Sequence, residues 1–266
     1  MMEPIRDSLW VWGHEAGSHN GQYNLQGISR MTPAEGAYYL GVPNLIMVTY
    51  GNHPEPPFET RMRALSPLKR VVWSVLGDSS SSRDDLPEVL SLAERFPNLV
   101  GGIMDDFFRP PDAQGAISRY SVADLQRLRR RLCRGTRALS LWVVLYAHDL
   151  GLDVQPYLAQ CDVVTFWTWK ADDLAALEAN LPRAKALARD KPLVLGCYMW
   201  DYGAQRPMPV EAMERQCQLG LGWLKRGEVA GMIFLASCIA DLGLGAVEWT
   251  RRWIATVGDE PLEGTV

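Results

Sequence analysis

The chain has 266 residues, of which 47% are hydrophobic and 22% are charged, and its formal net charge is −4. This length fits either two small domains or one large α/β barrel of about 250 residues, and such a chain needs no disulfide or metal to stay folded. The mildly acidic balance argues against a nucleic-acid partner, and no apolar run is long enough to span a membrane.

The cysteines and the first residues bear on the compartment. No two cysteines have zinc-ribbon or redox spacing, so reduced, structural thiols are expected. The five are Cys133, Cys161, Cys197, Cys217 and Cys238. Arg6 and Asp7 stand where a secretory signal would be apolar. We therefore expect a cytoplasmic protein.

Predicted strands and helices alternate along the chain. Eight short segments rich in β-branched and aromatic residues are mostly continuously apolar, as strands buried on both faces are. They are 9–13, 44–50, 70–76, 99–105, 139–146, 162–169, 192–200 and 231–237. Thr32, Pro33 and Glu35 form an N-cap, a first-turn proline and a capping box, so a helix begins at 33. Ser121 opens another helix, and further helical patterns cover 172–188 and 209–225.

This alternation predicts the fold class. Strand–helix units repeated in this order give parallel strands with right-handed crossovers, and eight such units close into a barrel. The prediction is an α/β protein with a single (β/α)8 TIM barrel over residues 1–266. An open doubly wound sheet is the alternative, but it would normally carry a glycine-rich phosphate motif after the first strand. Residues 12–18 match that motif only loosely, because the glycines are wrongly spaced.

The residues that end the predicted strands are expected to form the active site, because barrels of this kind carry it at the carboxyl ends of their strands. Here aromatic rings, histidines and carboxylates gather there, and the third strand leads to Asp78. Such a set suits a pyranose, whose C–H face stacks on an aromatic ring while its hydroxyls form hydrogen bonds. Aromatic residues that merely cap the barrel are the alternative. The predicted substrate-binding residues are His14, Glu15, Tyr50, Tyr146, His148, Trp167, Trp169, Lys170, Tyr198, Trp200 and Asp201.

Two adjacent aspartates, Asp105 and Asp106, follow the apolar run 99–104 and are the predicted catalytic residues. Carboxylates at the tip of a buried strand are costly unless they are paired, hydrated or used. Repulsion between two such groups raises one pKa, which can keep an acid protonated near neutral pH. The alternative is a helix-capping or loop-bracing role.

The run Met104-Asp105-Asp106-Phe107 resembles the adjacent aspartate pair of O-GlcNAcase-type glycoside hydrolases. More loosely, it is similar to the acidic motif after the fourth strand of chitinase- and hexosaminidase-like barrels. The resemblance implies that the 2-acetamido oxygen of the substrate attacks the anomeric carbon. It also implies that Asp105 orients this amide and that Asp106 is the general acid/base. The chain lacks the Asp-x-x-Asp-x-Asp-x-Glu run of chitinases.

The sequence therefore predicts a glycoside hydrolase that acts on a small glycoside or oligosaccharide without cofactor or metal. In ordinary two-carboxylate hydrolysis, Glu15, Asp149 or Asp201 would supply the second carboxylate. The short loops favour an exo-acting pocket.

Three alternatives remain open. A metal-dependent isomerase or lyase-type barrel could use His14, Glu15, Asp105 and His148, although they lack known ligand spacing. A Schiff-base aldolase could use Lys170 if the lysine were desolvated. A carbohydrate-binding barrel without catalysis is the third.

Overall fold

The computed structural model describes residues 3–76, 83–135 and 137–262, so Asp78 lies outside the described residues. Eight parallel strands form a closed barrel in the order β1-β10-β7-β6-β5-β4-β3-β2, which confirms the predicted (β/α)8 fold. The barrel strands are β1 (Leu9–Gly13), β2 (Asn44–Met47), β3 (Arg70–Leu76), β4 (Leu99–Met104), β5 (Ser140–Tyr146), β6 (Val163–Trp167), β7 (Leu193–Tyr198) and β10 (Gly231–Leu235).

The helices follow the strands as predicted. They are α1 (Pro33–Leu40), α2 (Glu59–Ala64), α3 (Leu86–Arg95), α4 (Val122–Leu132), α5 (Gln155–Leu158), α6 (Leu177–Ala188), α7 (Val210–Lys225) and α8 (Gly245–Val257). The capping box that starts α1 is confirmed, because Thr32 Oγ1 accepts from Glu35 N at 3.3 Å and Thr32 N donates to Glu35 at 2.8 Å. The described residues also form the short 3-10 helices η1 (Ile5–Ser8), η2 (Ala147–Asp149), η3 (Asp172–Ala176) and η4 (Ser237–Ile239).

Five strands end before the residue that the sequence predicted, because the chain turns as soon as it leaves the barrel. Two of them, the predicted strands 99–105 and 231–237, end at Met104 and Leu235. The predicted strand 44–50 ends at Met47, since Tyr50 and His53 instead pair with each other around a tight turn. The predicted strand 192–200 ends at Tyr198, and the next residues form β8 (Trp200–Asp201), which pairs antiparallel with β9 (Arg206–Pro207). The predicted strand 162–169 ends at Trp167.

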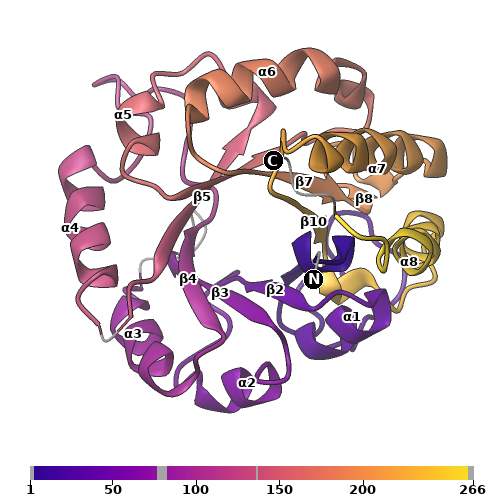
Figure 1. Cartoon of the computed structure of the whole chain (residues 1–266), viewed down its shortest axis with the longest axis horizontal. Helices are drawn as coiled ribbons and strands as arrows, with labels where there is room; N and C mark the ends of the chain where they lie inside the picture. The colour runs from indigo at the N-terminus through magenta and orange to yellow at the C-terminus, as the bar shows by residue number, and fades with distance from the viewer. Residues whose placement is uncertain (1–2, 77–82, 136, 263–266) are drawn as a thin grey trace. The chain divides into compact units, whose positions relative to one another are not determined.

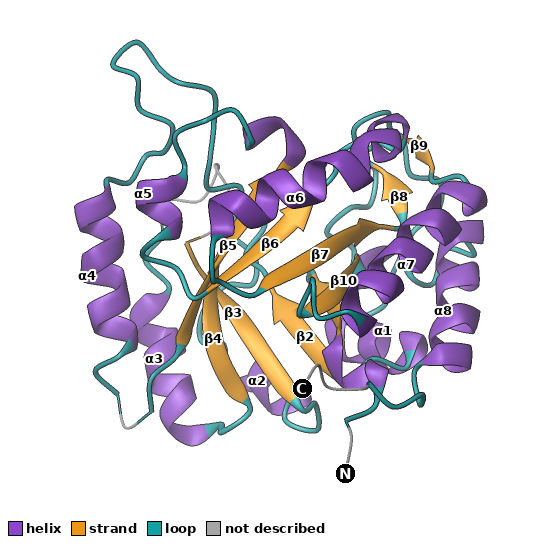
Figure 2. Cartoon of the chain, turned by 45° about the horizontal axis from the view of Figure 1, so that its top comes forward, coloured by secondary structure: helices purple, strands orange, loops and turns teal. Residues whose placement is uncertain are grey.

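The chain divides into two compact units. The first contains Met1–Ile46, Thr168–Glu178 and Val194–Val266. In it, β10 pairs with β1 on one side and with β7 on the other, and α1, α7 and α8 lie outside these strands (Figure 1). The second contains Met47–Trp167 and Ala179–Leu193. In it, β3, β4, β5 and β6 lie side by side (Figure 2). That residues 1–266 form a single domain stays a prediction.

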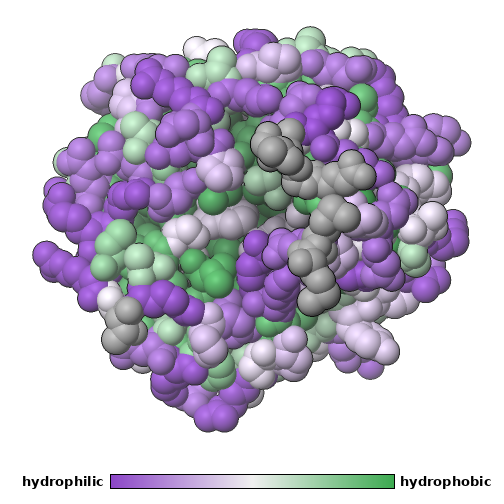
Figure 3. Space-filling view, viewed as in Figure 1, coloured by the Kyte–Doolittle hydropathy of each residue, from purple (hydrophilic) through white to green (hydrophobic). Residues whose placement is uncertain are grey.

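Close packing around β4 positions the aspartate pair. A Cβ added to Gly102 would lie 2.6 Å from Val75, and one added to Gly101 would lie 2.5 Å from Ser140. Only glycine therefore lets β3 and β5 approach β4 so closely on both sides. The face in Figure 3 is largely hydrophilic around its periphery, as expected where the outer sides of the helices meet water.

Candidate functional site

The loop after β4 presents the two predicted catalytic aspartates differently. Asp105 is half-buried, whereas Asp106 is exposed and has a φ of 43°. This left-handed conformation is one that aspartate and asparagine tolerate better than most residues. The backbone N–H of Asp106 donates to Asp105 Oδ1 at 2.9 Å. The turn thus uses one carboxylate to hold the backbone and leaves the other at the surface.

Tyr146, the last residue of β5, joins this loop to a third carboxylate. Its hydroxyl donates to Asp106 Oδ1 at 2.7 Å, and its backbone N–H donates to Asp149 Oδ2 at 3.0 Å. Asp149 ends η2, the turn that directly follows β5. One tyrosine therefore contacts an exposed carboxylate through its side chain and a buried one through its backbone.

His148 lies on the same turn and is largely exposed. Its ring stacks on that of Tyr146 with centroids 5.0 Å apart, and its Nε2 lies 3.7 Å from Asp149 Oδ1. Burial raises the pKa of Asp149, and the nearby charge of Asp106 raises it further. The Tyr146 N–H and His148 act in the opposite direction, without cancelling that rise. Asp149 is thus a buried carboxyl that resists ionisation.

Aromatic packing anchors the aspartate loop from below. Phe107 and Phe108 are both buried, and their ring centroids lie 5.0 Å apart. Both rings also pack edge-on against Tyr157, and Phe107 stacks on Tyr120. The two residues after Asp106 therefore anchor the loop by packing on other aromatic rings.

The first unit carries a separate cluster of rings at the ends of β1 and β7. His14 and His19 are buried with ring centroids 4.5 Å apart, and His19 Nδ1 lies 2.9 Å from the Tyr202 hydroxyl. Tyr202 also contacts Tyr198 and Trp169. The predicted site residues did not include His19 or Tyr202. His19 lies in the loop beyond β1, whose length was the available signal, and Tyr202 directly follows β8.

Other predicted substrate-binding residues in this unit have evident structural partners. Asp201 is fully buried, forms an ion pair with Arg206 at 3.1 Å and accepts from the Ala204 N–H. The indole N–H of Trp200 donates to a backbone carbonyl, that of Tyr23. Lys170 is exposed, so the desolvation that a Schiff-base lysine requires is absent at this position.

The remaining predicted residues vary in exposure. Glu15 and Tyr50 are half-buried, and Trp167, in the second unit, is buried with its indole N–H on Thr165 Oγ1 at 2.8 Å. Within 3–76, 83–135 and 137–262, no three His, Cys, Asp or Glu side chains are grouped so that they could hold a metal ion. The same part of the chain contains no helix long and apolar enough to cross a membrane.

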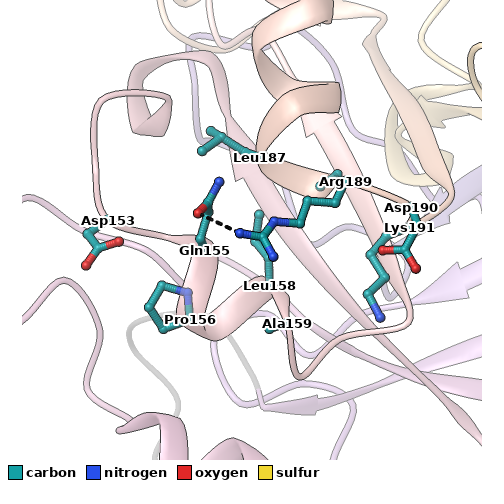
Figure 4. A pocket seen from close by; sticks show the side chains of 10 residues that line it. Asp153, Gln155, Pro156, Leu158, Ala159, Leu187, Arg189, Asp190 and Lys191 are labelled. Carbon is teal, nitrogen blue, oxygen red and sulfur yellow. Dashed lines mark hydrogen bonds between the residues drawn. The ribbon is translucent and has the colours of Figure 1, made fainter.

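A cavity of about 420 Å³ lies in the second unit between α5 and the turn that follows α6 (Figure 4). Its lining includes Gln155 and Arg189, whose side chains form a hydrogen bond of 3.3 Å across it. Lys191 and Asp190 lie at its other end (Figure 4). None of the predicted catalytic or substrate-binding residues lines this cavity.

Acid should destabilise the protein through the buried histidines. Burial lowers the pKa of His19 from its usual 6.5 to about 4, and lowers that of His14 as well. As pH falls from 6.5 to 4, the unfolded chain binds protons that the folded chain does not. This difference at His19 alone lowers the free energy of unfolding by about 3 kcal/mol. Urea unfolding at pH 7 and pH 4.5 should show a smaller acid-induced loss in His19→Gln than in wild type. The exposed His53→Gln is the control, and an unchanged loss in His19→Gln would contradict the assignment.

Comparison with known proteins places the fold. No protein-family model matches the sequence, and neither does any curated protein. Among solved structures, the chain is similar to a xylanase-α-amylase inhibitor protein in complex with trehalose, with a TM-score of 0.59 and 14% identity over 94% of this chain and 98% of that one. It is also similar to active domain 2 of a chitinase from Pyrococcus furiosus, with a TM-score of 0.57 and 10% identity over 100% of this chain and 99% of that one.

A third similar structure is a glycoside hydrolase family 5 enzyme from Prevotella bryantii B14 in complex with a xyloglucan tetradecasaccharide. Its TM-score is 0.54 at 12% identity, over 95% of this chain and 99% of that one. At such low identities these likenesses establish the barrel fold, and function has to be argued from the site.

Proposed function

We propose that this protein is a glycoside hydrolase that cleaves a small glycoside or oligosaccharide, with Asp106 as general acid/base. The observation that carries the proposal is the exposed Asp106 carboxylate, held by the Tyr146 hydroxyl at 2.7 Å beside Asp105. It follows a barrel strand at its carboxyl end, where such enzymes place their carboxylates. Two of the similar barrels, the chitinase and the family 5 enzyme, act on carbohydrates by their names, which supports the same class.

The proposed reaction is substrate-assisted hydrolysis of a 2-acetamido sugar. The acetamido oxygen forms a bond to the anomeric carbon, the bond from that carbon to the leaving oxygen breaks, and Asp106 gives its proton to the leaving oxygen. The Asp106 carboxylate then takes a proton from water while the water oxygen attacks the anomeric carbon and releases the acetamido group. Asp105 would orient the amide, and the turn that it holds would fix Asp106.

The substrate-binding residues remain proposals. In the second unit, Tyr146 ends β5, His148 lies in the turn after it and Tyr50 follows β2, and all three would contact the sugar. The buried Trp167 would support the site rather than meet the substrate. In the first unit, the proposed sugar-binding residues are His14, Glu15, Trp169, Lys170, Tyr198, Trp200 and Asp201. Among these, a sugar-binding role has the least support at Asp201, because Arg206 already neutralises its carboxylate.

A barrel that binds carbohydrate without cleaving it is the second candidate. The observation that favours it is the likeness to the xylanase-α-amylase inhibitor protein, whose structure contains trehalose. Such a protein would bind sugars with unchanged affinity after Asp106→Asn and would cleave none.

A panel of aryl glycosides with and without a 2-acetamido group tests the proposal. Cleavage confined to 2-acetamido sugars would support the substrate-assisted reaction. Cleavage of plain hexosides would keep the hydrolase but require a second carboxylate, such as Glu15, as base or nucleophile. No turnover of any glycoside, with sugar binding still measurable by calorimetry, would overturn the hydrolase and favour the binding protein.

A further inference from the structure

Asp149 is a buried carboxyl whose pKa responds to the charge of the proposed acid Asp106, and the reaction above gives it no role. We propose that Asp149 is a positioning residue for Asp106, that Tyr146 links the two, and that the two carboxyls hold the catalytic proton as a coupled pair. This inference rests on the proposed hydrolase function. It adds a second carboxyl, buried and out of reach of the substrate, that sets when Asp106 carries a proton.

Hydrogen bonds connect Asp149 to Asp106 through Tyr146. Asp149 Oδ2 accepts the backbone N–H of Tyr146 at 3.0 Å, which fixes the turn at the end of β5. The Tyr146 hydroxyl then reaches Asp106 Oδ1 at 2.7 Å. The position of that hydroxyl depends on the turn, so Asp149 determines indirectly where the Asp106 carboxylate is held. The ring of His148 stacks on that of Tyr146 and so supports the tyrosine.

Asp149 and Asp106 also interact electrostatically. Among the described residues, the Tyr146 N–H and His148 favour ionisation of Asp149, whereas the charge of Asp106 opposes it. Interaction between two titrating groups is reciprocal, so a charge on Asp149 opposes ionisation of Asp106 by the same free energy. When the pair holds a single proton, that proton is shared between Asp149 and Asp106. The form with the proton on Asp106 is the one that can donate to a leaving oxygen.

Asp149 and His148 differ in their exposure to solvent. The side chain of Asp149 is only 2% exposed, whereas that of His148 is 61% exposed and lies 3.7 Å from it. Asp149 therefore cannot meet a sugar directly, and His148 is its neighbour on the solvent side. Asp149 is thus a buried carboxyl that controls charge, and Asp106 is an exposed carboxyl that transfers the proton. In other active sites, too, different environments give two carboxyls different roles.

The test that does not depend on activity is an NMR titration of the Asp149 carboxyl carbon in wild type, Asp106→Asn and Tyr157→Phe. Removing the Asp106 charge should lower the Asp149 midpoint, which should stay above the usual aspartate value because burial remains. Tyr157→Phe, whose ring packs on Phe107 and Phe108, should leave it unchanged. The same Asp149 midpoint in Asp106→Asn as in wild type would overturn the coupling, whether or not any glycoside is cleaved.

The activity test uses the glycoside found in the panel. Tyr146→Phe and Asp149→Asn should each lower kcat roughly 10- to 100-fold with KM within about twofold, because positioning rather than binding is lost. In Asp149→Asn the alkaline limb of the kcat/KM profile should move to lower pH, whereas Tyr157→Phe should match wild type. A fall in kcat with no movement of that limb would reduce Asp149 to a structural brace and contradict the shared proton. If the panel shows no turnover while the NMR midpoint still shifts, the hydrolase fails and the coupling survives.

Discussion

Replacing Asp106 by asparagine is expected to lower kcat/KM by roughly 10²- to 10⁴-fold, the contribution usual for a positioned general acid/base. Asparagine is the appropriate replacement because it tolerates the left-handed backbone at this position, where φ is 43°. Its amide oxygen can still accept from the Tyr146 hydroxyl. The loss should therefore report proton transfer rather than a displaced loop, and it is measured with aryl glycosides of good and poor leaving groups.

The leaving group and the controls make this result decisive. A poor leaving group needs protonation, so it should show the larger loss in Asp106→Asn, and an aryl group of low pKa the smaller one. Asp105→Asn should lower the rate for both leaving groups alike if Asp105 orients the acetamido group. The exposed Asp173→Asn should behave as wild type. An Asp106→Asn protein that retains full activity on a poor leaving group would remove Asp106 from the mechanism.

The second large effect is expected on stability, at Trp73 of β3. This side chain is fully buried and stacks on Phe58 with ring centroids 5.2 Å apart. Truncation to alanine leaves a large cavity, so Trp73→Ala should lower the free energy of unfolding by about 3–5 kcal/mol. Urea unfolding with an unchanged m value would show that the change lies in stability rather than in the unfolded state.

Trp73→Phe is the matched control for this experiment. The indole N–H of Trp73 has no hydrogen-bond partner in the part of the chain that the structure describes. Phenylalanine keeps an aromatic ring against Phe58 and removes this buried donor, so it should cost less than half as much as alanine. If the two variants were equally destabilised, packing alone would not account for the loss.

The strand pattern was readable from the sequence because buried parallel strands leave a local signature. The predicted strands 9–13 and 70–76 match β1 and β3 residue for residue, because both are largely apolar segments bordered by polar residues or glycine. The start of α1 was equally readable, because a capping box is a contact between residues three apart. The ends of strands were harder to predict from the sequence. β2 stops three residues early, where Tyr50 pairs with His53 instead of with a barrel neighbour.

The barrel, the aspartates after β4 and the aromatic residues that follow the strands could be predicted from the sequence. All of these depend on short-range pattern and on the rule that strand ends carry the chemistry. Which groups meet in the candidate site follows from the tertiary fold. Tyr146 reaches Asp106 across 40 residues of sequence, and Asp149 acquires its raised pKa from burial. Similarly, Arg206 neutralises Asp201 within a hairpin that the sequence pattern did not predict. Hydrogen bonds and burial between distant segments depend on how strands pair and loops pack, and that information is not local in the sequence.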